Sequence, residues 1–126
     1  MTISVPRALR VLIVEDDAII SMLLAELLAE MGYEVCATAA TEAEAVAAAR
    51  RDKPNLMIVD ARLRGGSGVS AVEEILRAGP VPHIFLSGAP GSVRALRPDA
   101  VVIGKPFRQA ELVGAIEIAL AASGVG

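Results

Sequence analysis

Acidic, hydroxyl and basic side chains follow four short apolar runs of this chain, each at the point where a run ends. They are the triplet Glu15-Asp16-Asp17, then Asp60, Ser87 and Lys105. Three carboxylates brought close together repel one another unless a cation lies among them. Carboxylate oxygens suit Mg²⁺, which keeps several waters and also binds phosphate. A carboxylate at such a site can be a nucleophile that forms an aspartyl phosphate, with Lys105 facing the phosphate oxygens and Ser87 donating a hydroxyl proton.

Five short runs rich in β-branched residues alternate with longer helical patterns, and this alternation must position those side chains. The predicted strands cover 9–14, 34–38, 55–59, 82–86 and 100–103, and the predicted helices cover 18–31, 41–51, 69–76 and 112–120. Strand–helix alternation predicts an α/β fold with a doubly wound, five-stranded parallel sheet. Ligands of such sheets bind beyond the carboxyl ends of the strands. If the first and third strands are neighbours, Glu15, Asp16 and Asp60 converge on one small volume.

Local signals refine this pattern in three places. Asp17 is expected to be the N-cap of the first helix, and Thr41 with Glu44 forms a capping box for the second. The segment 87–99 is rich in Gly and Pro, so we expect a loop with one turn around 93–96 there. The fourth helix is therefore predicted to be shortened or missing.

Taken together, the motifs resemble the receiver domain of two-component response regulators over about 9–120. The matching motifs are Val14-Glu15-Asp16-Asp17, Val59-Asp60, Gly68, Ser87 and Lys105-Pro106-Phe107. The resemblance implies a flavodoxin-like sheet with strand order 2-1-3-4-5. It also implies a phosphoacceptor signalling protein that receives a phosphoryl group, with Mg²⁺, from a phosphohistidine on a sensor kinase or a histidine phosphotransfer protein.

The resemblance also assigns roles to individual residues. It implies that Asp60 is the phosphoacceptor, that Lys105 pairs with the phosphoryl group, and that Ser87 senses it and moves the loop after the fourth strand. The metal ligands that it implies are Glu15, Asp16, Asp60 and the main-chain carbonyl of Arg62. On this basis we expect no enzyme activity beyond the chain's own phosphorylation and dephosphorylation.

A narrower resemblance comes from the fourth strand. The segment 82–88 reads Pro-His-Ile-Phe-Leu-Ser-Gly and resembles a Pro-x-x-Phe-Ala-Thr-Gly motif of stand-alone receivers that work with kinases of the HWE type. The interval from Ser87 to Lys105 is shorter than these domains usually have. Val102 replaces the aromatic residue that often rotates when the family is phosphorylated. Switching is therefore expected to run through Ser87 and its loop.

Composition argues against several other classes of protein. With 126 residues, 54% of them apolar, we expect a single domain over 1–126 with short flexible tails and no output domain. The longest stretch without charge, 78–93, is interrupted by Pro and Gly, which argues against a membrane span. A net charge of −3 argues against nucleic-acid binding. A lone Cys36 and the lack of a signal peptide favour the cytoplasm, and we expect a monomer or weak dimer.

Several competing interpretations share parts of this pattern. The segment 66–71 matches G-x-G-x-x-A, but no acidic residue follows at the distance that a dinucleotide-binding fold requires. Gly104-Lys105 lacks the remainder of a phosphate-binding P-loop. An aspartyl-nucleophile phosphatase would need a second Asp where Arg62 stands. A phosphorylation-independent interaction module that keeps the receiver fold remains the main alternative.

Overall fold

Five strands form one parallel sheet in the computed structural model, which describes residues 8–122. They are β1 (Arg10–Val14), β2 (Glu34–Ala39), β3 (Leu56–Asp60), β6 (His83–Ser87) and β7 (Val101–Gly104). Their spatial order is β2-β1-β3-β6-β7, which is 2-1-3-4-5 when the strands of this sheet are counted along the chain. The predicted fold class and strand order are therefore confirmed. The expectations for the two tails lie outside the described residues.

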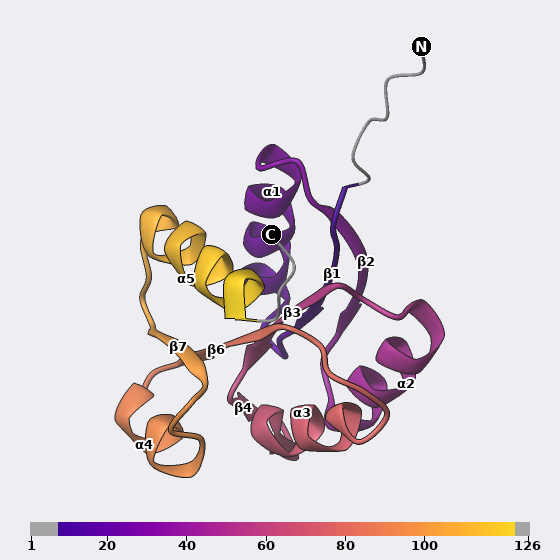
Figure 1. The fold of residues 1–126 in the computed structure, drawn as a ribbon, viewed down its shortest axis with the longest axis vertical. Coiled ribbons are helices and arrows are strands. Elements are labelled where there is room, and N and C mark those ends of the chain that lie inside the picture. The colour runs from indigo at the N-terminus through magenta and orange to yellow at the C-terminus, as the bar shows by residue number, and fades with distance from the viewer. Residues whose placement is uncertain (1–7, 123–126) are drawn as a thin grey trace.

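Helices cover both faces of the sheet (Figure 1). α1 (Ala18–Glu30) and α5 (Gln109–Ala122) lie on one face, and α2 (Glu42–Asp52), α3 (Gly68–Leu76) and α4 (Pro90–Leu96) lie on the other. Alternate residues of each strand point to opposite faces, so two hydrophobic cores form. Val11 and Ile13 pack towards α1 and α5, whereas Leu12 and Val14 pack towards α2 and α3. Among residues 8–122, no helix is long and apolar enough to cross a bilayer.

Polar caps fix where the first two helices begin. Asp17 accepts hydrogen bonds from the amides of Ile19 and Ile20 at 2.9 and 3.2 Å, and Thr41 Oγ1 accepts one from the Glu44 amide at 3.1 Å. Both predicted N-caps are present, because these oxygens satisfy amides that have no partner inside the helix. In a capping box the carboxylate also accepts from the amide of the N-cap residue. Here the Glu44 carboxylate accepts instead from the amide of Ala40, the residue before Thr41.

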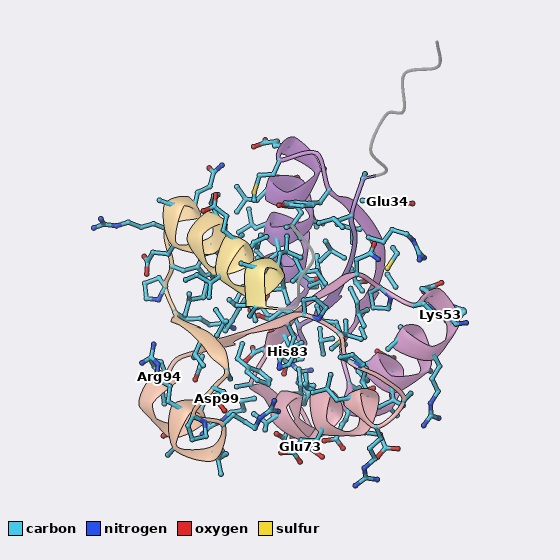
Figure 2. The ribbon with its side chains drawn as sticks, in the orientation of Figure 1. Glu34, Lys53, Glu73, His83, Arg94 and Asp99 are labelled. Atoms are coloured by element: carbon cyan, nitrogen blue, oxygen red, sulfur yellow. The ribbon has the colours of Figure 1, made fainter. Side chains whose placement is uncertain are left out.

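The fourth helix is shortened and not lost. The segment expected to be a loop forms α4, a helix of seven residues. Pro90 stands in its first turn, where the amide hydrogen that proline lacks would have no partner within the helix. Val93 is buried against the sheet. The helix ends before Arg97 because the following proline disfavours helical backbone there. From α4, Arg94 Nη2 donates to the main-chain oxygen of Val102 in β7 at 3.2 Å (Figure 2).

A small hairpin that the sequence analysis did not predict follows β3. β4 (Arg62–Leu63) pairs antiparallel with β5 (Gly66–Ser67), so that Arg62 faces Ser67. Gly65 turns the chain with φ +73°, a conformation that costs glycine little. The hairpin lies between β3 and α3, beside the carboxyl end of the central strand.

Candidate functional site

Three carboxylates meet at the carboxyl ends of β1 and β3, which are paired neighbours in the sheet. One oxygen from each of Glu15, Asp16 and Asp60 lies within 4.8 Å of the others. The register pairs Val14 of β1 with Val59 of β3. Glu15, which follows Val14, therefore lies beside Asp60, which follows Val59. Glu15 and Asp60 are only 3% and 8% exposed, while Asp16 is half-buried. The arrangement concentrates negative charge in a partly dehydrated space.

Lys105 supplies the positive charge of this cluster. Its Nζ atom donates to Glu15 Oε1 at 2.8 Å and to Asp60 Oδ2 at 2.7 Å. The lysine follows the last strand, β7, and its amide donates to the main-chain oxygen of Ser87 at 2.8 Å. One cation therefore pairs with carboxylates from two different strands.

Burial changes the proton affinity of the cluster. Burial, together with the neighbouring Asp60 carboxylate, raises the pKa of Glu15 from 4.5 to about 7. Burial alone would lower the pKa of Lys105, but its bonds to Asp60 and Glu15 outweigh this effect and raise that pKa. The two carboxylates thus favour the charged form of Lys105, while burial favours the neutral form of Glu15.

Main-chain amides of the hairpin hold two of the carboxylates. The Arg62 amide donates to Asp60 Oδ1 at 3.0 Å, and the Arg64 amide donates to Asp16 Oδ2 at 2.9 Å. Gly68 then passes so close to β3 that an added Cβ would overlap the main-chain oxygen of Asp60. Only glycine fits at this position without a shift of the backbone.

Ser87 ends β6 on the other side of Asp60. It is 7% exposed, and its Oγ atom accepts a hydrogen bond from the Ala89 amide at 2.9 Å. A cavity of about 740 Å³ is lined by Asp16, Asp60, Arg62, Ser87, Lys105 and residues along α4. The cavity thus connects the acidic cluster with the loop that leads into the shortened helix.

The donor set suits a hard divalent cation. Mg²⁺ prefers oxygen ligands, retains several waters and binds through one or two carboxylates. Asp16 Oδ1 has no hydrogen bond among residues 8–122, so it is an available oxygen. The site therefore combines a mostly buried acidic cluster, a lysine and a hydroxyl group around one carboxylate, Asp60.

All six candidate residues lie near this point, but one acidic residue of the Glu15-Asp16-Asp17 triplet does not belong to the cluster. The structure places Glu15, Asp16, Asp60 and Lys105 in contact or near contact, with Arg62 and Ser87 along the same cavity. The Asp17 carboxylate instead caps α1. The contact from the Arg64 amide to Asp16 was not predicted. The glycines at 65, 66 and 68 were the feature of the sequence that could have indicated a tight turn there.

Comparison with known families gives one match that spans most of the chain. The model of the response regulator receiver domain matches residues 11–117. Over 93% of its length the chain is 40% identical to the transcriptional regulatory protein PdtaR of Mycobacterium tuberculosis, and it covers 58% of that protein. It is 38% identical to the phyllosphere-induced regulator PhyR of Methylorubrum extorquens, over 90% of this chain and 44% of that one. The chain thus spans about half the length of these two relatives.

Two further relatives match over nearly their whole length, and a third matches over about half of its length. The chemotaxis protein CheY of Thermotoga maritima is 32% identical, over 85% of this chain and 93% of CheY. Among solved structures, the receiver domain of Erythrobacter litoralis PhyR superposes with a TM-score of 0.83 at 37% identity, over 90% and 91% of the two chains. The anti-anti-sigma factor PhyR of Bartonella quintana gives 0.84 at 31% identity, over 93% of this chain and 49% of that one.

Proposed function

Because the chain belongs to the response regulator receiver domain family, we propose that it is a phosphoacceptor of a two-component or phosphorelay system, with Asp60 as the residue that is phosphorylated. The observation that carries the proposal is the position of the Asp60 carboxylate. It ends the central strand, bonds to Lys105 at 2.7 Å and lies within 4.8 Å of two further carboxylates. It also opens onto a cavity large enough to admit a phosphoryl group and its donor.

The transfer itself requires positioning more than covalent chemistry from the protein. A carboxylate oxygen of Asp60 attacks the phosphorus of a phosphohistidine, the phosphorus–nitrogen bond breaks, and the imidazole of the donor leaves. Lys105 stays beside the new acyl phosphate and offsets its charge. Burial of Asp60 reduces competition from water for the hydrogen bonds around it.

We propose that Glu15, Asp16, Asp60 and the main-chain carbonyl of Arg62 hold Mg²⁺. The carboxylate oxygens already lie close enough together to share one ion. When bound, Mg²⁺ supplies positive charge to the oxygens of the phosphoryl group. The role proposed for Arg62 is supported by its amide, which bonds to Asp60 at 3.0 Å and holds the backbone beside the cluster.

Ser87 is proposed to report the phosphorylated state. Its oxygen now accepts from the Ala89 amide, one residue before α4. A hydroxyl that turned to donate to a phosphoryl oxygen would release this bond and let the start of α4 move. A local change in charge would thereby bias the position of the loop and the short helix.

The partners proposed from this chemistry are a sensor histidine kinase, a histidine phosphotransfer protein, or both. Receiver domains exchange phosphoryl groups with such proteins, and the open side of the cavity is where a donor histidine can approach. We propose that the chain has no enzyme activity beyond its own phosphorylation and dephosphorylation.

The direct test is intact mass spectrometry of the chain after incubation with acetyl phosphate and Mg²⁺. We expect one added phosphoryl group, and none for Asp60→Asn, which keeps the size of the side chain. Asp16→Ala should lose labelling together with its dependence on Mg²⁺. Labelling of Asp60→Asn at the wild-type level would refute the assignment of the phosphoacceptor. A wild-type chain that stays unmodified with both acetyl phosphate and a cognate kinase would instead support a phosphorylation-independent interaction module.

A further inference from the structure

Besides Leu63, which is buried in the core, three main-chain amides connect the β4–β5 hairpin to the rest of the molecule, and each of them donates to a carboxylate. The Arg62 amide bonds to Asp60 at 3.0 Å, the Arg64 amide to Asp16 at 2.9 Å, and the Ser67 amide to Glu42 Oε1 at 3.3 Å. Two of these acceptors belong to the acidic cluster. The third, Glu42, is the first residue of α2 and lies outside the cluster.

The bond from Arg64 decides how the Asp16 carboxylate is turned. It engages Oδ2 and leaves Oδ1 available for a cation. A carboxylate held by a fixed amide loses less rotational freedom when it binds an ion, which is how groups outside the ligand set tune a metal site. The orientation of Asp16 therefore depends on where the hairpin stands.

A hairpin of this size cannot hold its own position. Each strand has two residues, and a short two-stranded ribbon is unstable alone in water. Arg62 and Arg64 are exposed, and their guanidinium groups form no ion pair among residues 8–122. The hairpin therefore depends on contacts from neighbouring elements.

Glu42 supplies such a contact from α2. Besides accepting from Ser67, its side chain lies directly over Gly66, where an added Cβ would stand 3.4 Å from Glu42 Cβ. Glu42 is half-buried and follows the N-cap Thr41, so its backbone is fixed by the start of the helix. It holds the far strand of the hairpin while the near strand bonds to Asp60.

We propose that Glu42 is a positioning residue for the acidic site, which acts through the hairpin to orient Asp16 towards a divalent cation. The proposal rests on the proposed function, because it concerns the same cluster. Glu42 touches neither the cation nor the phosphoryl group. Its effect is carried by two hydrogen bonds, from Ser67 to Glu42 and from Arg64 to Asp16.

Two substitutions of Glu42 distinguish the effect of its hydrogen bond to Ser67 from the effect of its charge. Glu42→Asp keeps the negative charge at the start of α2 but is too short to reach Ser67. Glu42→Gln loses the charge and keeps an oxygen that can accept. Glu73→Ala is the control, because Glu73 lies on the outer side of α3, is exposed, and its side chain makes no hydrogen bond or ion pair with any of residues 8–122 (Figure 2).

Mg²⁺ binding to the full chain is measured by isothermal titration calorimetry. We expect the dissociation constant to rise about tenfold for Glu42→Asp, the size of effect seen for groups that orient metal ligands, and to stay near wild type for Glu42→Gln and Glu73→Ala. Without metal, amide hydrogen exchange at Arg64 and Ser67 should be faster in Glu42→Asp alone. A purely structural role of Glu42 would change unfolding but not this affinity.

Two results would overturn the proposal. One is an affinity of Glu42→Asp equal to wild type, and the other is a loss of affinity that is greater in Glu42→Gln than in Glu42→Asp, which would identify charge as the cause. Either result leaves wild-type phosphorylation of Asp60 intact, so the proposed function would stand. A wild-type chain that binds no Mg²⁺ would remove the metal part of the proposed function and this inference together.

Discussion

Replacing Lys105 by Met tests how the acidic cluster is stabilised without a bound cation. Lys105 Nζ bonds to Glu15 at 2.8 Å and to Asp60 at 2.7 Å, and the side chains of these acids are 1% and 11% exposed. Met keeps most of the length and apolar contact of the lysine. It removes the positive charge and leaves two buried carboxylates without a cationic partner. Breaking a buried pair in this way costs about 3–5 kcal/mol.

The stability lost in Lys105→Met must depend on pH, and the direction of this dependence follows from the pKa of Glu15. The pKa of Glu15 is raised to about 7 in the folded chain, so its contribution to stability is complete below about pH 4.5 and is lost as pH rises through 7. A rise from 4.5 to about 7 corresponds to about 3 kcal/mol. Lys105 lowers this pKa, so Lys105→Met raises it further. We expect the variant to lose about 3 kcal/mol relative to wild type at pH 8 and less than half of that at pH 5.

Urea unfolding followed by far-UV circular dichroism measures this, since the chain has no Trp. Mg²⁺ should stabilise Lys105→Met more than wild type at pH 8, because the variant's carboxylates bind no competing ammonium group. Lys53→Met is the matched control, because Lys53 is the other lysine of the chain and lies at the end of α2 (Figure 2). Equal losses for Lys105→Met at pH 5 and pH 8, or no extra gain from Mg²⁺, would refute the reasoning.

Two further substitutions test the close contact of Gly68 with β3 and the burial of His83 at the start of β6. Gly68→Ala should lower the free energy of unfolding by at least about 2 kcal/mol, measured by urea unfolding. The added Cβ would overlap the Asp60 main-chain oxygen and stand 2.7 Å from Val59 Cγ1. An unchanged unfolding midpoint would show that the backbone relaxes freely there. His83 has a pKa lowered by burial, so its contribution to stability is complete above pH 6.5 and is lost as pH falls through its lower folded pKa. His83→Gln should therefore lose less stability than wild type between pH 7.5 and pH 5, and an identical loss would assign the effect to other groups.

The sheet and the acidic cluster could be predicted because they depend on local patterns. Strands buried on both faces must be continuous apolar runs, and parallel strands bring their carboxyl ends to one edge. Glu15 and Asp60 each follow such a run directly. Their convergence then needed only the pairing of the first and third strands, which β1 and β3 show.

The hairpin and α4 could not be predicted in the same way. The hairpin is held by bonds from Arg64 to Asp16 and from Ser67 to Glu42, and these partners are distant in sequence. In α4, the Gly and Pro content favoured a loop, but burial of Val93 and a proline in the first turn were sufficient for two turns of helix. Tertiary contacts outweighed local propensity at both places.

The bond from Arg94 to Val102 has a consequence for the behaviour of the protein in concentrated solution. β7 is an outer strand of the sheet, and outer strands expose main-chain groups that can pair with a strand of another molecule. Arg94 already occupies the Val102 carbonyl and places a charge beside it. An incoming strand would have to displace a guanidinium group before it could pair there. The short helix α4 thus blocks one main-chain pairing position of the outer strand β7.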